Sequence, residues 1–200
     1  MKRLQALLNK QGNDLKIDGT IGPKTIEALE GLIKLRLIEF PKIPFLCGIR
    51  TDSKLTNTFD DYLYIRTNVV KRVVPCSTTP GKYWIKHPMN AKGTAILKPG
   101  LYKNSHKFIT NPNWNFLWLK APYFQQVQPV TVYRDANGNE LIDRYSAEIG
   151  LFGINIHRGG LGSFIDRWSA GCIVVPDNDW YKLVYSFNNG DIISLGLVEI

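Results

Sequence analysis

The chain has 200 residues, a formal net charge of +8, a hydrophobic fraction of 44% and an aromatic fraction of 12%. This composition is typical of a globular protein and excludes a disordered chain, and the length fits a small module joined to one catalytic-sized domain. The positive charge favours polyanionic partners, but the basic residues are scattered and form no basic helix, so we expect no nucleic-acid binding.

The N-terminus alternates polar and apolar residues and lacks the apolar stretch of about 7 to 15 residues that a secretory signal needs. No run approaches the roughly 18 apolar residues of a membrane span. We therefore expect a protein that is made in the cytoplasm without a signal peptide and does not insert stably into a membrane.

Two helices are predicted first along the chain. Leu4, Leu7 and Leu8 recur at helical spacing until the polar stretch that begins at Gly12. Gly22-Pro23 then offers a helix start with proline at the first position. The apolar face of this second helix consists of Ile26, Leu29, Ile33 and Leu37.

The stretch LQALLNKQGNDLKIDGTIGPKTIEAL resembles the peptidoglycan-binding module of the three-helix type, through its leucine-rich first helix, its D-G-x-x-G-P turn and the threonine-led helix that follows. The resemblance covers residues 1–38 and implies a module over 1–40 that holds glycan or stem peptide without reacting with it. The alternative is an ordinary helical hairpin, because D-G and G-P are common turn signals.

Pro41 and Pro44 disfavour helix and predict a linker over 41–60, after which valine, isoleucine, tyrosine and threonine become frequent. Residues 61–200 are therefore expected to form a mainly β domain. Strands are predicted over 61–66, 69–75, 82–86, 129–134, 140–143, 150–156, 172–175 and 191–199.

Other local signals complete this domain. Residues 101–127 show no clear period and predict long loops or a lid. Asn137-Gly138 favours a tight hairpin, because both positions tolerate positive φ. Asp177 can cap a helix carrying Trp180, Leu183 and Val184, and Asn189-Gly190 would end it before the last strand.

The three cysteines, Cys47, Cys76 and Cys172, are odd in number and show no CxxC spacing, so neither a disulfide framework nor a zinc site is indicated. Cys47 and Cys76 are interpreted as small buried hydrophobic residues. His87 and His106 lack metal-ligand spacing and are interpreted as surface or hydrogen-bonding residues. We expect no metal and no cofactor.

The window INIHRGGLGSFIDRWSAGCIVVP places His157 after an apolar strand and Cys172 before another, with a glycine-rich connection that lets the two ends meet. A free thiol is mostly protonated at neutral pH, and a neighbouring imidazole can accept its proton. Ala170 and Gly171 leave the backbone uncluttered, so nearby N–H groups could bind an oxyanion. The pattern predicts acyl transfer to cysteine.

NIHRGG followed by RWSAGCIVV resembles the signature of L,D-transpeptidases of the YkuD type, in which a histidine is followed by serine or threonine and then H-G-C. The stretch STTPGKYWI resembles the T-P-x-G-x-[FY] segment upstream of that active site, with one spacer residue missing. The resemblance spans residues 61–199. It implies a mainly β, L,D-transpeptidase-like sandwich behind a small all-α N-terminal module.

The resemblance also implies roles for individual residues. Cys172 would be the acylated nucleophile and His157 the general base, oriented by the main-chain carbonyl of Arg158. Gly171 and Cys172 would donate backbone N–H groups to the oxyanion, and Ser169 matches the serine of the motif.

There are two departures from the family pattern. Ala170 stands where the family has histidine, and the interval from His157 to Cys172 is shorter than in the family. Endings of the form S-A-G-C resemble those of phage-type lysins and wall-attacking effectors. We therefore predict a hydrolase acting on stem peptides, an L,D-carboxypeptidase or endopeptidase, whose partners are peptidoglycan stem peptide and glycan and which reaches the wall through a holin-type or secretion-system route.

Three alternatives stay open at this stage. The same thioester could be given to an amine, forming or exchanging cross-links. The chain could be a non-catalytic wall-binding or structural phage protein. A glycosidase would use two carboxylates, for which Glu140, Asp143 and Glu148 are candidates, but no spacing singles out a pair.

Overall fold

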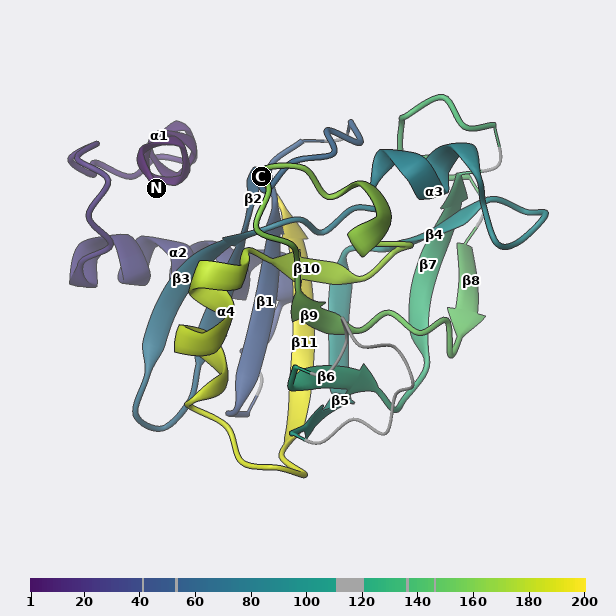
Figure 1. Cartoon of the computed structure of the whole chain (residues 1–200). Helices are drawn as coiled ribbons and strands as arrows, with labels where there is room; N and C mark the ends of the chain where they lie inside the picture. The colour runs from purple at the N-terminus through teal and green to yellow at the C-terminus, as the bar shows by residue number, and fades with distance from the viewer. Residues whose placement is uncertain (41, 53, 111–120, 136, 146) are drawn as a thin grey trace.

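The computed structural model describes residues 1–40, 42–52, 54–110, 121–135, 137–145 and 147–200 (Figure 1). Its helices are α1 (Lys2–Lys10), α2 (Pro23–Leu37), α3 (Lys82–Lys86), the short 3₁₀ helix η2 (Asp166–Trp168) and α4 (Asp177–Val184). Its strands are β1 (Phe45–Arg50), β2 (Asp61–Arg66), β3 (Lys71–Cys76), β4 (Thr94–Leu97), β5 (Gly100–Ile109), β6 (Tyr123–Gln126), β7 (Val130–Asp135), β8 (Ala147–Gly150), β9 (Ile156–Arg158), β10 (Ile173–Val175) and β11 (Ile192–Glu199). The mainly β class predicted from the sequence is confirmed.

Eight strands form one curved sheet in the order β10-β9-β6-β5-β11-β1-β2-β3, and β4-β7-β8 form a smaller sheet. The pairs β1–β11 and β9–β10 are parallel. An antiparallel bridge joins Ser77, just after β3, to Val174 in β10. Because β3 and β10 are the two edge strands, this bridge nearly closes the large sheet on itself, and it does so one strand away from His157.

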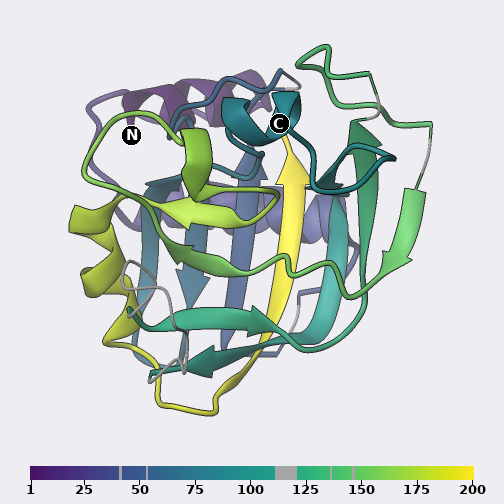
Figure 2. The same ribbon diagram turned by 45° about the vertical axis from the view of Figure 1, so that its right-hand side comes forward.

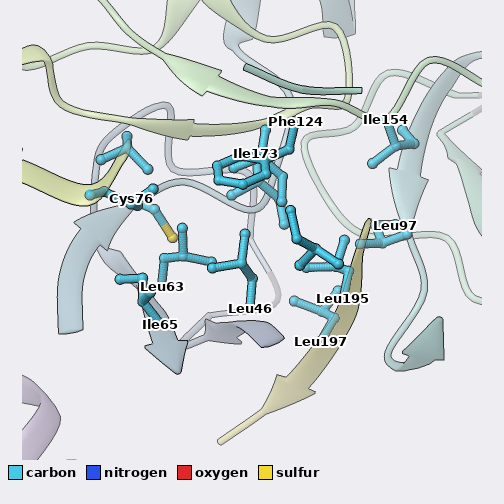
Figure 3. Packing of buried hydrophobic residues seen from close by; sticks show 14 of the residues in the cluster. Leu46, Leu63, Ile65, Cys76, Leu97, Phe124, Ile154, Ile173, Leu195 and Leu197 are labelled. Carbon is cyan, nitrogen blue, oxygen red and sulfur yellow. The ribbon is translucent and has the colours of Figure 1, made fainter. Parts of the chain in front are cut away.

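The inner core lies inside the curve of this sheet. It gathers residues from both sheets and from α4, including Leu46, Phe124, Ile173 and Leu195 (Figure 3). Trp180 of α4 is fully buried there. This core contacts β9 and β10 from one side through Ile156, Ile173 and Val175.

α1 and α2 cover the opposite face of the sheet, away from α4 (Figure 2). Leu4, Leu29 and Ile33 share a second core with sheet residues such as Phe45 and Tyr64. Both helices form at the predicted positions, but they are packed against the sheet and do not build a core of their own. A segment of this size gains most of its stability from such a neighbour.

Several predicted strands agree closely with the structure. The predictions at 61–66, 69–75, 129–134, 172–175 and 191–199 correspond to β2, β3, β7, β10 and β11. α4 also forms in the predicted region, but Pro176 and not Asp177 is in the capping position, and the helix ends at Val184, before the predicted end at Asn189-Gly190. Gly138 has φ +64°, but the tight hairpin predicted at Asn137-Gly138 is wrong, since the strand that pairs with β7 is β8, which begins only at Ala147.

Three strand predictions are wrong. Residues 82–86 form the one-turn helix α3. Only Ile85 is buried in it, and one buried residue cannot distinguish the spacing of a helix from the alternation of a strand. Residues 140–143 form no strand apart from one bridge at Leu141 and instead run through side-chain-bonded turns at Asn137 and Asn139. Residues 151–155 are irregular and separate β8 from β9.

Several strands were not predicted, among them β4 and β8. The segment interpreted as the linker 41–60 contains β1, whose six residues are all buried between β11 and β2. Position 48 is suited to glycine, because a Cβ there would lie too close to its neighbours, 2.9 Å from Leu197 and 3.1 Å from Thr78. The predicted loop or lid at 101–127 contains β5 and β6, and its residues 111–120 lie outside the described part of the chain.

Candidate active site around Cys172

Cys172 and His157 come from neighbouring strands. His157 lies in β9 and Cys172 directly precedes β10, and the parallel pairing sets Val174 opposite His157. Side chains alternate between the faces of a strand, so Cys172, Val174 and His157 share one face. Their neighbours Ile156 and Ile173 belong to the inner core. The cysteine and the histidine therefore point to the face away from that core.

The Cys172 thiol is partly exposed and donates a hydrogen bond to the Gly153 carbonyl, with 3.3 Å between Sγ and the oxygen. Desolvation raises the pKa of the thiol to about 11, while the N–H groups of Asn155 and of Cys172 itself oppose that shift. The side chain is therefore a neutral thiol near pH 7. It becomes a strong nucleophile only when a base removes its proton.

His157 is held in one tautomer. Its side chain is 7% exposed, and Nδ1 lies 2.8 Å from the carbonyl oxygen of Arg158. Because a carbonyl only accepts, Nδ1 carries the hydrogen in this bond and Nε2 of the neutral ring keeps its lone pair. Burial lowers the pKa of His157, and the charge of Arg158 acts in the same direction. The ring is therefore a neutral base near pH 7, with Nε2 as the proton acceptor.

In the structure the Cys172 thiol donates its hydrogen bond to the Gly153 carbonyl and not to the His157 imidazole. Transfer of its proton to His157 therefore requires the Cys172 side chain to turn away from the Gly153 carbonyl. Such loose geometry is common in enzymes without bound substrate.

The turn before Cys172 is braced by Ser169. The fully buried Ser169 hydroxyl donates to the Cys172 carbonyl at 2.8 Å and accepts from the Gly171 N–H at 3.1 Å. Gly171 has φ +131°, and a Cβ there would lie 2.6 Å from the Ala95 carbonyl. The turn thus requires glycine at 171. The Gly171 N–H already donates to the Ser169 hydroxyl. It could donate to an oxyanion, as predicted, only if this hydrogen bond broke.

The segment STTPG lies directly against the cysteine turn. Ser77 exchanges two backbone hydrogen bonds with Val174, at 2.8 and 3.0 Å. The Gly81 N–H donates to the Ser169 carbonyl at 2.8 Å, and a Cβ on Gly81 would overlap the Asp166 carbonyl. The structure therefore brings together the two stretches that carry the resemblance in the sequence.

A network of buried charged residues also binds the STTPG segment. The fully buried Arg50 donates to the Thr78 hydroxyl at 3.0 Å and to the Thr78 carbonyl at 2.8 Å. The carboxylate of buried Asp61 accepts from the Thr78 N–H at 2.9 Å and from its hydroxyl at 2.7 Å. Glu199 pairs with Arg50 at 3.3 Å. Arg50 and Asp61 thus fix Thr78, next to the Ser77 bridge.

The loop 150–155, which offers the Gly153 carbonyl to the thiol, is fixed by side chains of the large sheet. Gln126 accepts hydrogen bonds from the backbone N–H groups of Phe152 and Ile154, at 3.1 and 2.9 Å. The buried ring of His106 lies with Nε2 2.7 Å from the Ile154 carbonyl. Sequence reasoning did not identify Gln126 as a structural partner of this loop.

The remaining candidate residues have structural partners. Cys47 and Cys76 are fully buried, and burial raises the pKa of both thiols, in agreement with their interpretation as core residues. His87 is exposed and His106 hydrogen-bonded, as predicted. The three carboxylates considered for a glycosidase bind different partners: Glu140 pairs with Lys82, Asp143 with Asn137, and Glu148 with Lys92 and Arg134.

Arg158 contributes through its side chain as well as its carbonyl. Its guanidinium pairs with Asp177 in the first turn of α4. This ion pair ties the end of β9 to α4.

Within the described ranges, no helix is long and apolar enough to cross a membrane. Over the same ranges, no group of three histidine, cysteine, aspartate or glutamate residues is placed to hold a metal ion.

Comparison with solved structures adds a structural likeness. No protein-family model matches the sequence, and no curated protein matches it. The chain is similar to the crystal structure of an L,D-transpeptidase (Yku) from Stackebrandtia nassauensis, with 12% sequence identity and a TM-score of 0.35, over 98% of this chain and 89% of that chain. At this identity and TM-score the likeness assigns neither a fold nor an activity to the chain.

Proposed function

We propose that the protein is a cysteine-dependent peptidoglycan hydrolase that cleaves wall stem peptides through a thioester on Cys172. The observation that carries this proposal is the placement of Cys172 beside β9, on the same face as a histidine whose Nδ1–H is held by the Arg158 carbonyl. A thiol and a neutral imidazole with an unprotonated Nε2 are the two groups that acyl transfer needs.

In the proposed reaction, the thiol proton passes to Nε2 of His157 as Sγ attacks the carbonyl carbon of the substrate. The oxyanion that forms is stabilised by backbone N–H groups of the cysteine turn, in the first place that of Cys172. The intermediate collapses as the leaving amine takes the proton from His157. Water then attacks the thioester with His157 as base, releasing a carboxylic acid and restoring the thiol.

The N-terminal segment 1–40 is proposed to bind glycan or stem peptide, since its turn D-G-T-I-G-P resembles that of the wall-binding module. In the structure this turn is fixed by Gln5, which accepts from the Gly19 N–H at 2.7 Å and donates to Asp18 at 3.1 Å. The net charge of +8 would favour approach to an anionic wall. Release through a holin-type or secretion-system route remains part of this proposal.

The first experiment incubates purified peptidoglycan with wild-type protein, Cys172→Ala and His157→Gln, followed by mass analysis of the soluble fragments. Peptide fragments or free amino acid appearing only with wild type support the proposal, and intact-protein mass should show an acyl adduct on Cys172. Cys76→Ala is the matched control, because that thiol is fully buried in the core.

Other results would favour the alternative functions. Products in which the acyl group has passed to an added amine would indicate a transpeptidase. Equal glycan fragments from wild type and Cys172→Ala would indicate a glycosidase. Binding to peptidoglycan without any product would indicate a wall-binding protein.

A further inference from the structure

A cavity of about 220 Å³ lies beside the cysteine turn. Ala170, two residues before Cys172, lines it from one side, and Phe152, which precedes the carbonyl that binds the thiol, lines it from another. Ala95 also contributes, and its carbonyl packs against Gly171. The cavity therefore touches both stretches of backbone that position the reactive sulfur.

Arg134 supplies a cation to this cavity. Its side chain extends from β7, which pairs with β4 in the smaller sheet (Figure 1), and it is 10% exposed. Nε donates to Glu148 at 3.1 Å, and Nη1 donates to the Gly93 carbonyl at 3.3 Å. Within the described chain, no residue accepts a hydrogen bond from Nη2. The guanidinium carbon also lies 5.0 Å from the centre of the Phe152 ring, a cation–π contact.

The charges around the cavity leave a positive excess. Glu148 is shared, with one carboxylate oxygen on Arg134 and the other on Lys92 at 2.6 Å. Two cations thus face one anion, and both hold the pKa of Glu148 below its usual range. An arginine that is nearly buried and has a donor left over is suited to bind a planar anion such as a carboxylate.

The size of the cavity limits what can enter. Sites that enclose a whole small molecule measure roughly 300 to 1,000 Å³. The smaller volume here fits one side group of a larger substrate. Trp84, Met89 and Phe152 provide apolar walls for its carbon chain, and Asn90 adds a polar group to the lining. Ala170 contributes only a methyl group, so a larger residue there would fill part of the space.

We propose that this cavity is a specificity subsite for a carboxylate-bearing side group of the acyl donor, with Arg134 as the residue that binds the carboxylate. This inference rests on the proposed function, because it supposes that Cys172 is acylated by a stem peptide. Arg134 would then act on the choice of donor and its orientation, and the chemical step would remain with Cys172 and His157.

The test uses two synthetic stem tetrapeptides that are identical except at one side-chain carboxylate, which is free in one and amidated in the other. The rate of Cys172-dependent product release is measured with each. Wild type should prefer the free carboxylate by about tenfold or more, as expected for a hydrogen bond to a charged group. Arg134→Gln should bring this ratio close to one and leave the rate with the amidated peptide within about threefold.

Two further variants separate this role from a loss of folding. Lys92→Gln removes the other partner of Glu148 without altering the cavity lining and should keep the preference. Ala170→Leu leaves the ion pair intact, narrows the cavity and should slow the reaction of the free-carboxylate peptide more than that of the amidated one. Thermal melting of each variant identifies any that fails to fold.

The two proposals fail in different ways. Equal wild-type rates with both peptides, or an unchanged preference in folded Arg134→Gln, would overturn the subsite while leaving cysteine acylation established. No Cys172-dependent product from either peptide would refute the proposed function, and the subsite with it.

Discussion

Replacing His106 by glutamine should make the stability of the protein less sensitive to acid. The ring is fully buried, with Nε2 2.7 Å from the Ile154 carbonyl and Nδ1 2.8 Å from the Ser105 hydroxyl. The carbonyl can only accept, so the neutral ring carries its hydrogen on Nε2. Burial lowers the pKa of His106 from 6.5 to about 4.

The sign of the effect follows from proton uptake. The unfolded chain protonates this histidine as the pH falls through 6.5, whereas the folded protein does so only near pH 4. The unfolded state therefore binds more protons between these values, and stability that is present at pH 7 is lost on acidification. With 1.36 kcal/mol for each pH unit between the two pKa values, the loss amounts to about 3 kcal/mol.

Urea denaturation of wild type and His106→Gln, followed by tryptophan fluorescence at half-unit steps from pH 7 to pH 4, measures this difference. The variant should be less stable at pH 7 by about 1 to 3 kcal/mol, through imperfect hydrogen bonding. Its deficit should shrink steadily towards pH 4, while His87→Gln serves as a surface control. Parallel pH profiles for wild type and His106→Gln would refute the assignment of a buried neutral histidine.

Three other substitutions or reactions test the site. Gly171→Ala should abolish activity and lower the melting temperature, whereas Gly162→Ala, where a Cβ has open space, should do neither. Arg50→Met should lower the free energy of unfolding by about 3 to 5 kcal/mol in urea titrations, because it leaves Asp61 buried without its cation. Alkylation of Cys172 by iodoacetamide should keep accelerating from pH 8 to pH 10, because the pKa of its thiol is raised to about 11, and levelling near pH 8 would contradict that shift.

The sequence predicts the fold best where local pattern and tertiary environment agree. In β11, a long apolar run occupies the middle of the large sheet, and both its position and its type follow from the sequence. β1 was missed because the prolines at 41 and 44 and Gly48 locally disfavour a strand. Its existence depends on two partners, β11 and β2, that come from distant parts of the chain. Nothing local to residues 45–50 reports them.

The same distinction between local pattern and tertiary environment applies to the residues of the candidate site. Cys172 and His157 could be identified from sequence because nucleophile and base are recognised by residue type and short spacing. Gln126 could not, because its side chain replaces backbone partners that residues 151–155 would have had in a strand. Arg50 and Asp61 have no distinguishing pattern in the sequence, and in the structure they are buried where they bind Thr78, beside the bridge that nearly closes the sheet.

That closure also couples the stability of the fold to the geometry of the site. Thr78 is bonded on one side by Arg50 and Asp61, and the preceding Ser77 forms the bridge to Val174. Val174 lies two residues after Cys172, so a displaced Thr78 would shift the strand that carries the sulfur. Asp61→Asn should therefore reduce activity even at temperatures where the variant remains folded. The reason is that the hydrogen bonds of Asp61 to Thr78, which stabilise the closure of the sheet, also set the position of the nucleophile.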